Sequence, residues 1–167
     1  MLGHGDKMQR AGGFSLIELL IVVAIILIIA ALAIPSLLNS RIAADEAAAA
    51  STIRLLNSAQ ITYNSTYPTI GYASSLAALS GTNCSPPSST NACLIDTVLA
   101  GGVKTGYSFS LPASSVTGTP ASTYQFIASP VLWQYSGIRY FCSYSDAVVR
   151  VNSTAISTCD GTISPMN

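Results

Sequence analysis

Residues 14–64 read FSLIELLIVVAIILIIAALAIPSLLNSRIAADEAAAASTIRLLNSAQITYN, and this stretch decides the fold. From Phe14 to Ile34 it is a nearly unbroken run of Leu, Ile, Val and Ala with one charged residue, Glu18. A helix needs about 20 apolar residues to cross a bilayer core of about 30 Å. The run supplies that length once, so the sequence predicts a single membrane-spanning helix.

Beyond this run the pattern changes to a helix with one apolar face. The residues of that face recur at steps of three, four or seven: Leu38, Ile42, Ala49, Ile53, Leu56 and Tyr63. Pro35 lies where the two patterns meet, and a proline removes a backbone donor and clashes with the preceding turn. Because residues 43–50 strongly favour helix, we expect a kink at Pro35 and one helix from about Phe14 to Asn64.

The remaining sequence predicts a small domain built on the second half of this helix. Residues 67–106 are mostly loop, with helical turns expected at 74–79 and 93–100. From Gly106 the apolar period becomes two, which predicts four short antiparallel strands, at 107–111, 123–128, 138–144 and 147–151. The expected fold class is therefore α+β, a long N-terminal helix packed against a small antiparallel sheet.

Length and composition set the domain organisation. The chain has 167 residues, of which 8% are charged, and its formal net charge is zero. This favours one domain plus an anchoring segment, and it argues against a nucleic-acid surface. We divide the chain into a leader (1–13), an apolar helix (14–35), an amphipathic helix (36–66) and a globular region (67–167).

The chain contains four cysteines, at positions 84, 93, 142 and 159. An even count in an exported domain indicates disulfides, and four cysteines allow three connectivities. We expect the two local pairs, Cys84–Cys93 and Cys142–Cys159. The alternative is a set of free buried thiols in a cytosolic protein.

The sequence offers little for catalysis. Its one histidine, His4, lies in the leader, and no nucleophile–base pair, phosphate-binding loop or metal cluster is visible, so we expect no enzyme and no cofactor. Asp146 and Asp160 are the candidates for a calcium site. Both lie in turns rich in Ser and Gly, where Asp commonly accepts hydrogen bonds from its own backbone, and we favour that role.

The string GGFSLIELLIVVAII at 12–26 closely resembles the processing site of type IV prepilins and type II secretion pseudopilins. The match comprises a short basic leader, Gly13 before the cut, Phe14 as the first mature residue, Glu18 as the fifth, and Pro35 at mature position 22. The resemblance implies that an inner-membrane peptidase cleaves between Gly13 and Phe14 and methylates the amine of Phe14.

The resemblance continues more weakly downstream. Residues 94–109 and 137–150 look like the globular part of one bacterial pilin-like subgroup, and a region bounded by Cys142 and Cys159 is similar to the disulfide-closed region of many pilins. The chain departs from the family at Leu27, where many members have glycine. This departure implies a stiffer helix, with Pro35 as its main weak point.

Glu18 is the unusual residue in the apolar run, because a carboxylate within a spanning segment is costly and is usually paired. We hypothesise that it pairs with the Phe14 amine of a neighbouring subunit and sets the axial stagger of a filament. The alternative is local: Glu18 lies four residues after Phe14, so it can pair with its own amine or favour the helix N-terminus.

The favoured function is the structural subunit of a type IV pilus that polymerises with itself. Its other partners would be the peptidase and N-methyltransferase, the inner-membrane assembly machinery, and the membrane before assembly. Lys7 and Arg10 precede the span, which favours a cytoplasmic N-terminus. Assembled subunits would lie in an extracellular pilus, with motility or adhesion as properties of the filament, or in a periplasmic pseudopilus.

Several alternatives remain open at this point. The subunit can be a type II secretion pseudopilin or a minor pilin. A binding domain on a simple membrane anchor predicts no cleavage at Gly13. A cleavable signal would use Ala31-Leu32-Ala33 as its cutting site, but the apolar stretch is longer than such signals and carries Glu18.

Overall fold

The computed structural model describes residues 13–82 and 84–166. The chain divides into two compact units, Met1–Leu37 and Leu38–Asn167. The leader predicted at 1–13 falls almost wholly outside the described residues.

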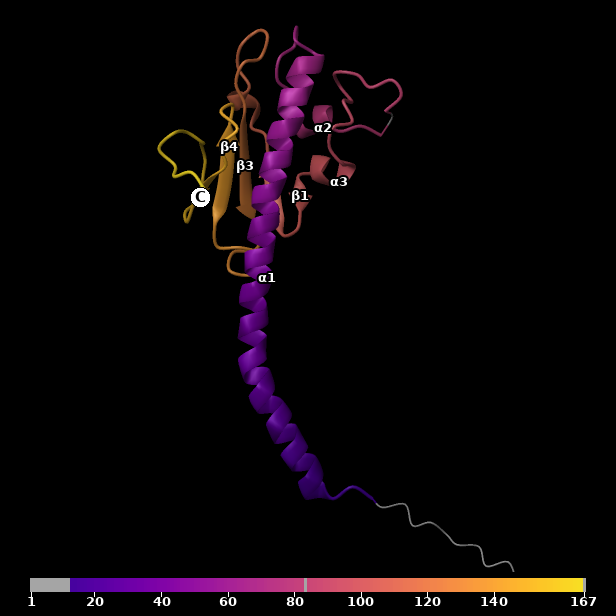
Figure 1. Ribbon diagram of the computed structural model, residues 1–167, viewed down its shortest axis with the longest axis vertical. Helices are drawn as coiled ribbons and strands as arrows, with labels where there is room; N and C mark the ends of the chain where they lie inside the picture. Colours follow the sequence, from indigo (N-terminus) through magenta and orange to yellow (C-terminus); the bar gives the residue numbers. More distant parts are fainter. Residues whose placement is uncertain (1–12, 83, 167) are drawn as a thin grey trace, which may run out of the picture. The chain divides into compact units, whose positions relative to one another are not determined.

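One helix, α1 (Leu16–Thr66), runs through both units and is the long helix of Figure 1. It has 51 residues and contains Pro35 without interruption. The helix ends at Thr66. The next residue, Tyr67, precedes Pro68, and a residue before a proline disfavours the helical conformation. The expected single helix from about Phe14 to Asn64 is therefore confirmed to within two residues at each end.

In the first unit, the side chains of α1 are almost all exposed. From Leu16 to Leu37 every residue is exposed except Ala30, which is half-buried. An 18-residue window of α1 has a mean hydropathy of 3.3, and none of it is buried. Within the described part of the chain, α1 is the one helix long and apolar enough to cross a membrane.

The second unit contains a five-stranded antiparallel sheet in the order β1-β2-β3-β4-β5, so each strand pairs with its neighbours in sequence. The strands are β1 (Val103–Lys104), β2 (Tyr107–Ser110), β3 (Gln125–Pro130), β4 (Tyr140–Tyr144) and β5 (Arg150–Asn152). The four predicted strands are present as β2 to β5, but β5 starts three residues later than predicted, because Ala147 has a positive φ of 60° and belongs to the turn after β4. The predicted count was wrong by one, because β1 has two residues and shows no alternation.

Short helices precede the sheet. Ser75 caps α2 (Leu76–Leu79) by accepting a hydrogen bond from the Ala78 N–H, and Asp96 caps α3 (Thr97–Ala100) in the same way from the Leu99 N–H. A 3₁₀ turn, η1 (Ala113–Ser115), follows β2. The turn predicted from 93 starts later than expected, because Cys93 has a positive φ of 56° and Asp96 sets the helix start.

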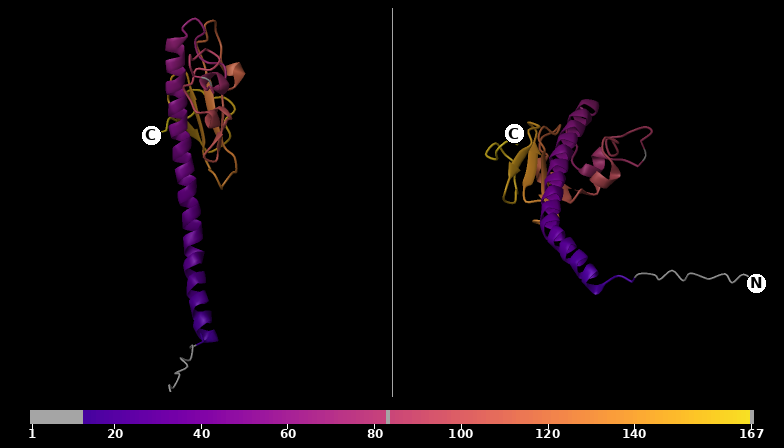
Figure 2. Two further views of the ribbon diagram at one scale, coloured as in Figure 1. Left: turned by 90° about the vertical axis from the view of Figure 1, so that its right-hand side faces the viewer. Right: turned by 60° about the horizontal axis from the view of Figure 1, so that its bottom comes forward.

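The main core lies between α1 and one face of the sheet, which lie side by side in Figure 2. The sheet contributes Tyr107, Phe109, Phe126, Ala128 and Phe141 to this core. A smaller cluster on the other face joins Ile127, Cys142, Ile156 and Cys159. Alternate residues of β3 thus pack into the two clusters on opposite faces of the sheet. The C-terminal segment covers the second cluster.

Candidate functional site

The junction between leader and helix lies at the start of the described chain. Gly13, Phe14 and Ser15 precede the first helical residue, and Phe14 is 83% exposed. Nothing lies within 4 Å of a Cβ built at Gly13. The Gly13–Phe14 peptide bond therefore lies outside the helix, and no described side chain packs against Gly13.

Glu18 contacts the backbone at this junction. The Ser15 N–H donates to Glu18 Oε2 at 3.4 Å. Ser15 precedes the helix and Glu18 is its third residue, which is the spacing of a capping box, in which an acidic side chain reaches back to the N-cap amide. The local role that we weighed for Glu18 is thus present in the uncleaved chain. Its carboxylate is exposed and keeps capacity for a second partner.

The second half of α1 carries buried polar side chains that our reading of the sequence missed. Glu46 accepts hydrogen bonds from the Ile138 N–H at 2.9 Å, the Arg139 N–H at 3.1 Å and the Arg139 Nε–H at 2.6 Å. We read residues 43–50 only as a strong helix former. The signal was available, however, because Glu46 follows Ile42 by four residues and precedes Ala49 by three, on the apolar face itself.

Asn57 and Gln60 extend this pattern along the same face. Asn57 donates to Ser143 Oγ at 2.9 Å and to the Ala147 carbonyl at 3.1 Å. It also accepts from the Tyr124 hydroxyl at 3.2 Å. Gln60 exchanges two hydrogen bonds with the backbone of Ala73, at 2.8 and 3.0 Å.

These buried amides and the Glu46 carboxylate are each satisfied by a different segment of the unit. Leaving any of them unpaired would cost the desolvation penalty of a buried polar group, about 1–3 kcal/mol. Sliding α1 along the sheet by one turn would break the bonds of Glu46 and Asn57. These two side chains therefore fix the register between α1 and the sheet, while Gln60 ties α1 to the segment before α2. The apolar face also starts later than predicted, since Leu38 is 37% exposed and Ile42 is half-buried.

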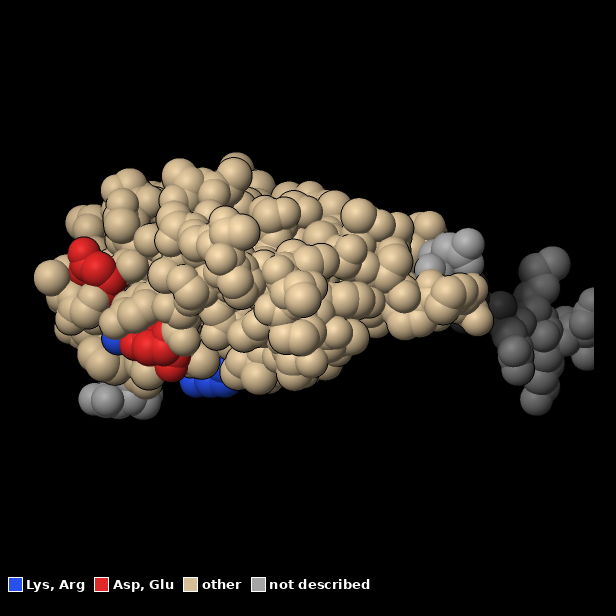
Figure 3. Space-filling model, turned by 90° about the horizontal axis from the view of Figure 1, so that it is seen from above, with Lys and Arg blue, Asp and Glu red and all other residues tan. Residues whose placement is uncertain are grey.

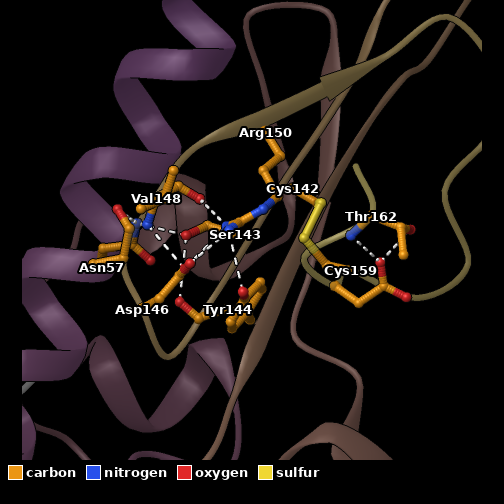
Figure 4. A network of polar contacts seen from close by, with 11 residues as sticks. Asn57, Cys142, Ser143, Tyr144, Asp146, Val148, Arg150, Cys159 and Thr162 are labelled. Atoms are coloured by element: carbon orange, nitrogen blue, oxygen red, sulfur yellow. Dashed lines mark hydrogen bonds and ion pairs between the residues drawn. A yellow bond between two sulfur atoms is a disulfide. The ribbon is translucent and has the colours of Figure 1, made fainter. Parts of the chain in front are cut away.

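A second polar network ties β4 to β5 (Figure 4). The Arg150 guanidinium donates to both carboxylate oxygens of Asp146, at 2.6 and 3.0 Å, and to the Tyr144 hydroxyl at 3.1 Å. It also lies 4.3 Å from the centre of the Tyr144 ring. The Val148 N–H donates to Asp146 Oδ1 at 3.0 Å, so Asp146 accepts a hydrogen bond from its own turn as expected.

This network sets the charge state of Asp146. Partial burial on its own raises the pKa of the carboxyl group, but hydrogen bonds from Arg150, the Val148 N–H and Tyr144 outweigh burial and hold the pKa below its ordinary value. Both oxygens are occupied by the guanidinium, so Asp146 is poorly disposed to bind calcium. Asp160 likewise accepts from the Thr162 N–H at 2.9 Å. Among the described residues, no group of three His, Cys, Asp or Glu side chains is arranged to hold a metal ion.

Both local disulfides that we expected are present. Cys84–Cys93 closes a segment of nine residues with an exposed Cys84, and Cys142–Cys159 closes one of 17 residues with both cysteines buried. The second bridge is visible in Figure 4 and holds the C-terminal segment against β4. The Cys159 N–H also donates to the Gln125 side chain on β3 at 2.9 Å.

Comparison with known families gives one match. Residues 8–34 match the prokaryotic N-terminal methylation motif, which includes Gly13, Phe14 and Glu18 and ends just before Pro35. No curated protein matches the chain in a sequence comparison. The match therefore concerns the junction and the apolar half of α1, and not the second unit.

Proposed function

We propose that this chain, which carries the class III prepilin signal of type IV pilins and pseudopilins at residues 8–34, is a structural subunit of a type IV pilus. The signal marks a pilin-like, membrane-anchored precursor and implies processing by a prepilin peptidase. It favours a structural protein over an enzyme. The type of filament and the residues that assemble it are our proposal.

The proposed maturation follows from the position of the signal. Cleavage between Gly13 and Phe14 removes residues 1–13 and leaves the whole apolar helix attached, whereas an ordinary signal peptide is cut after its apolar segment. The product has a free amine at Phe14, which the same enzyme methylates. A methylated amine stays basic and gains apolar surface, so it remains a partner for a carboxylate.

The observation that carries the proposal is the exposure of the first half of α1. From Leu16 to Leu37 its side chains are apolar except for Glu18 and Ser36, and all of them are exposed apart from Ala30, which is half-buried. Such a surface is stable in lipid or against other copies of the same helix. We propose that lipid covers it in the precursor and that neighbouring copies cover it in the filament core.

Glu18 supplies the specificity of this assembly. Buried between apolar helices, its carboxylate requires a cation, and the Phe14 amine of a neighbour is one. In the uncleaved chain its one described partner is the Ser15 N–H, a neutral donor. An intersubunit pair would therefore form only after cleavage and only in one axial register. Pro35 is proposed as the point where the helix bends during assembly.

A pseudopilin of a type II secretion system or a minor pilin is the second candidate. The absence of a well-formed acidic loop among the described residues counts against the calcium-binding type of pseudopilin, and the buried Cys142–Cys159 bridge favours a pilin exposed to the exterior. A binding domain on a plain anchor is a third candidate. It requires neither cleavage at Gly13 nor a carboxylate at Glu18.

The proposal is tested on filaments sheared from cells. We expect mass spectrometry of their subunits to find a tryptic peptide that begins at methylated Phe14. Recovery of that peptide from membranes alone would favour a pseudopilin or minor subunit. A chain that still begins at Met1 would contradict the proposal.

Two substitutions separate the possible roles of Glu18. Glu18→Ala removes both the charge and the contact with Ser15, while Glu18→Gln keeps a side chain that serves equally well in a capping box. If the charge pairs with a neighbouring amine, both variants should remain in the membrane and both should lose filaments. Normal filaments from Glu18→Gln, with loss only in Glu18→Ala, would show that Glu18 acts locally.

A further inference from the structure

We infer that a surface on the second unit rests in the interfacial layer of the bilayer while the subunit is still a membrane precursor. This loop surface consists of Val103, Val131, Leu132, Trp133, Tyr135 and Ile138. The inference rests on the membrane anchor alone and is independent of filament assembly.

The first argument is exposure. All six side chains are between 45% and 65% exposed, although four are aliphatic and two are large aromatics. Scattered apolar side chains are normal on a protein surface, but a contiguous group marks a contact site. Val103, Val131, Leu132 and Tyr135 line one hollow of about 660 Å³ together with Leu38 and Arg41. Trp133 and Ile138 belong to the same β3–β4 connection and lie close to these residues in the sequence.

The second argument is the rigidity of the loop. Exposure of apolar side chains on a flexible loop would not indicate a contact site. The connection from β3 to β4 is instead fixed by its own hydrogen bonds. The Val131 N–H donates to the Gly106 carbonyl at 2.9 Å, and Ser136 Oγ both accepts from the Leu132 N–H and donates to the Leu132 carbonyl. Glu46 holds the following residues, Ile138 and Arg139, through their amides.

Gly137 shows how closely this connection is packed. A Cβ at Gly137 would lie 2.0 Å from the Tyr107 hydroxyl, which itself donates to the Arg139 carbonyl at 2.8 Å. No side chain larger than hydrogen fits there. The backbone that carries Leu132, Trp133 and Tyr135 is therefore held in one conformation.

The third argument is position. No charged residue lies between Glu18 and Arg41, and the 20 residues from Leu19 to Leu38 would span about 30 Å as a helix, the thickness of a bilayer core. Leu38, the first residue of the second unit, therefore lies at the depth where the chain leaves the hydrocarbon. Leu38 lines the same hollow as Val131, Leu132 and Tyr135. Figure 1 shows the β3–β4 connection at the end of the sheet next to which α1 enters this unit.

The chemistry of the surface identifies lipid as its partner. Trp and Tyr concentrate at the membrane–water interface, where one part of the ring is apolar and another is solvated. The basic side chains in or beside the surface are each paired with an acid: Arg41 with Asp45, Lys104 with Asp96, and Arg139 with Glu46. The contact should therefore depend on apolar burial and not on anionic lipid.

The opposite end of the unit provides a control. Seen from the end where α1 finishes, the surface is mostly uncharged, with small groups of charged side chains (Figure 3). Tyr67 lies one residue beyond the end of α1, far along the helix from Leu38, and its ring is half-buried. A fluorescent probe at Tyr67 should report no lipid.

Trp133 is the one tryptophan in the chain, so its emission is a direct probe. The full-length chain is reconstituted in phosphatidylcholine vesicles at several protein-to-lipid ratios. Quenching is measured with phosphatidylcholine brominated near the headgroup end of its acyl chains, and with aqueous acrylamide. The comparison chains combine Trp133→Phe with either Tyr67→Trp or Leu27→Trp.

We expect blue-shifted Trp133 emission that loses most of its intensity with the brominated lipid at every protein-to-lipid ratio, while the Tyr67→Trp probe keeps its intensity. Leu132→Asp, at an exposed position, should reduce the lipid quenching of Trp133 and increase its quenching by acrylamide. Added salt should change neither result.

Three results would overturn the inference. Trp133 emission as accessible to acrylamide as that of the Tyr67→Trp probe would show that the surface faces water. Protection of Trp133 from acrylamide only at high protein-to-lipid ratios, without quenching by the brominated lipid, would show that the surface contacts a second copy of the chain. Absence of quenching at the Leu27→Trp probe would show that the helix is not inserted, and this would also remove the membrane anchor.

Discussion

The two halves of α1 differ in composition and in their relation to the rest of the chain. From Leu16 to Leu37 the side chains are exposed, whereas the second half buries nine: Glu46, Ala49, Ala50, Ile53, Leu56, Asn57, Ala59, Gln60 and Tyr63. The difference lies in the polar side chains. Glu46 and Asn57 make directional bonds to residues of and beside β4 that permit one register, while the charged residue of the first half is Glu18. An apolar face can therefore pack against any apolar partner. Buried polar groups determine which partner it packs against and in which register.

The largest expected effect compares isoleucines in the two halves. Ile53 is fully buried, so Ile53→Ala should lower the free energy of unfolding of the second unit by about 2–5 kcal/mol. Ile21 lies in the exposed half, and Ile21→Ala should leave that free energy unchanged. Urea unfolding of the full chain in detergent micelles, followed by near-ultraviolet circular dichroism, measures both. Equal losses from the two variants would mean that the halves do not differ as described.

The next effect concerns the two disulfides. Cys142→Ser with Cys159→Ser opens the 17-residue segment that covers the second core, and should cost about 3 kcal/mol of unfolding free energy. Cys84→Ser with Cys93→Ser opens the nine-residue segment, whose Cys84 is exposed, and should cost less. The same unfolding measurement ranks the two double variants. The reverse ranking would mean that the C-terminal segment contributes little to the core.

Glu46 tests whether buried polar side chains hold α1 to the sheet. Glu46→Ala leaves two backbone N–H groups and the Arg139 guanidinium without their acceptor, and should cost about 2 kcal/mol. The control is the neighbouring Asp45→Ala, which removes a contact of 4.0 Å with the exposed Arg41 and should cost less than about 0.5 kcal/mol. A loss of unfolding free energy no greater than that of Asp45→Ala would show that Glu46 does not hold α1 to the sheet.

The smallest effect is a pH dependence at Asp146. Its folded pKa lies below the ordinary value of 3.8, so its contribution to stability is complete above that value and is lost as the pH falls through the folded pKa. Asp146→Asn should lower the free energy of unfolding by about 1 kcal/mol at neutral pH, because an amide oxygen still accepts from Arg150. The gap between variant and parent should narrow as the pH falls below 3.8 and through the lower folded pKa. A gap independent of pH would assign the loss to packing instead.

Periodicity and turn chemistry were sufficient to predict much of the fold. The step of three and four placed Ile53, Leu56 and Tyr63 in the core, and alternation placed Phe109 and Phe126 there as well. The strand at Val103–Lys104 was not predictable, since two residues carry no period. The burial of Glu46, Asn57 and Gln60 was not predicted. Their spacing places them on or beside the apolar face, but the partners of Glu46 and Asn57 lie 86 to 93 residues away in the sequence.

The candidate site was predictable to a different degree. Gly13, Phe14 and Glu18 stand at offsets that resemble a known signal, and the methylation-motif match supports that reading of the N-terminus. The Ser15 amide contact of Glu18 follows a general capping rule that applies to its spacing. The loop surface was not predicted, because Val131, Leu132 and Trp133 lie between two predicted strands in a connection without a period, and only the folded connection shows that they are exposed.

The consecutive strand order has a consequence for the way an exported chain folds. Because each strand pairs only with its neighbours in sequence, the sheet of the proposed exported subunit can grow in the order in which residues emerge from the membrane. No early strand has to wait for a distant one. The C-terminal segment, released last, then closes over β3 and β4, and oxidation of its final cysteine locks a structure that is already complete.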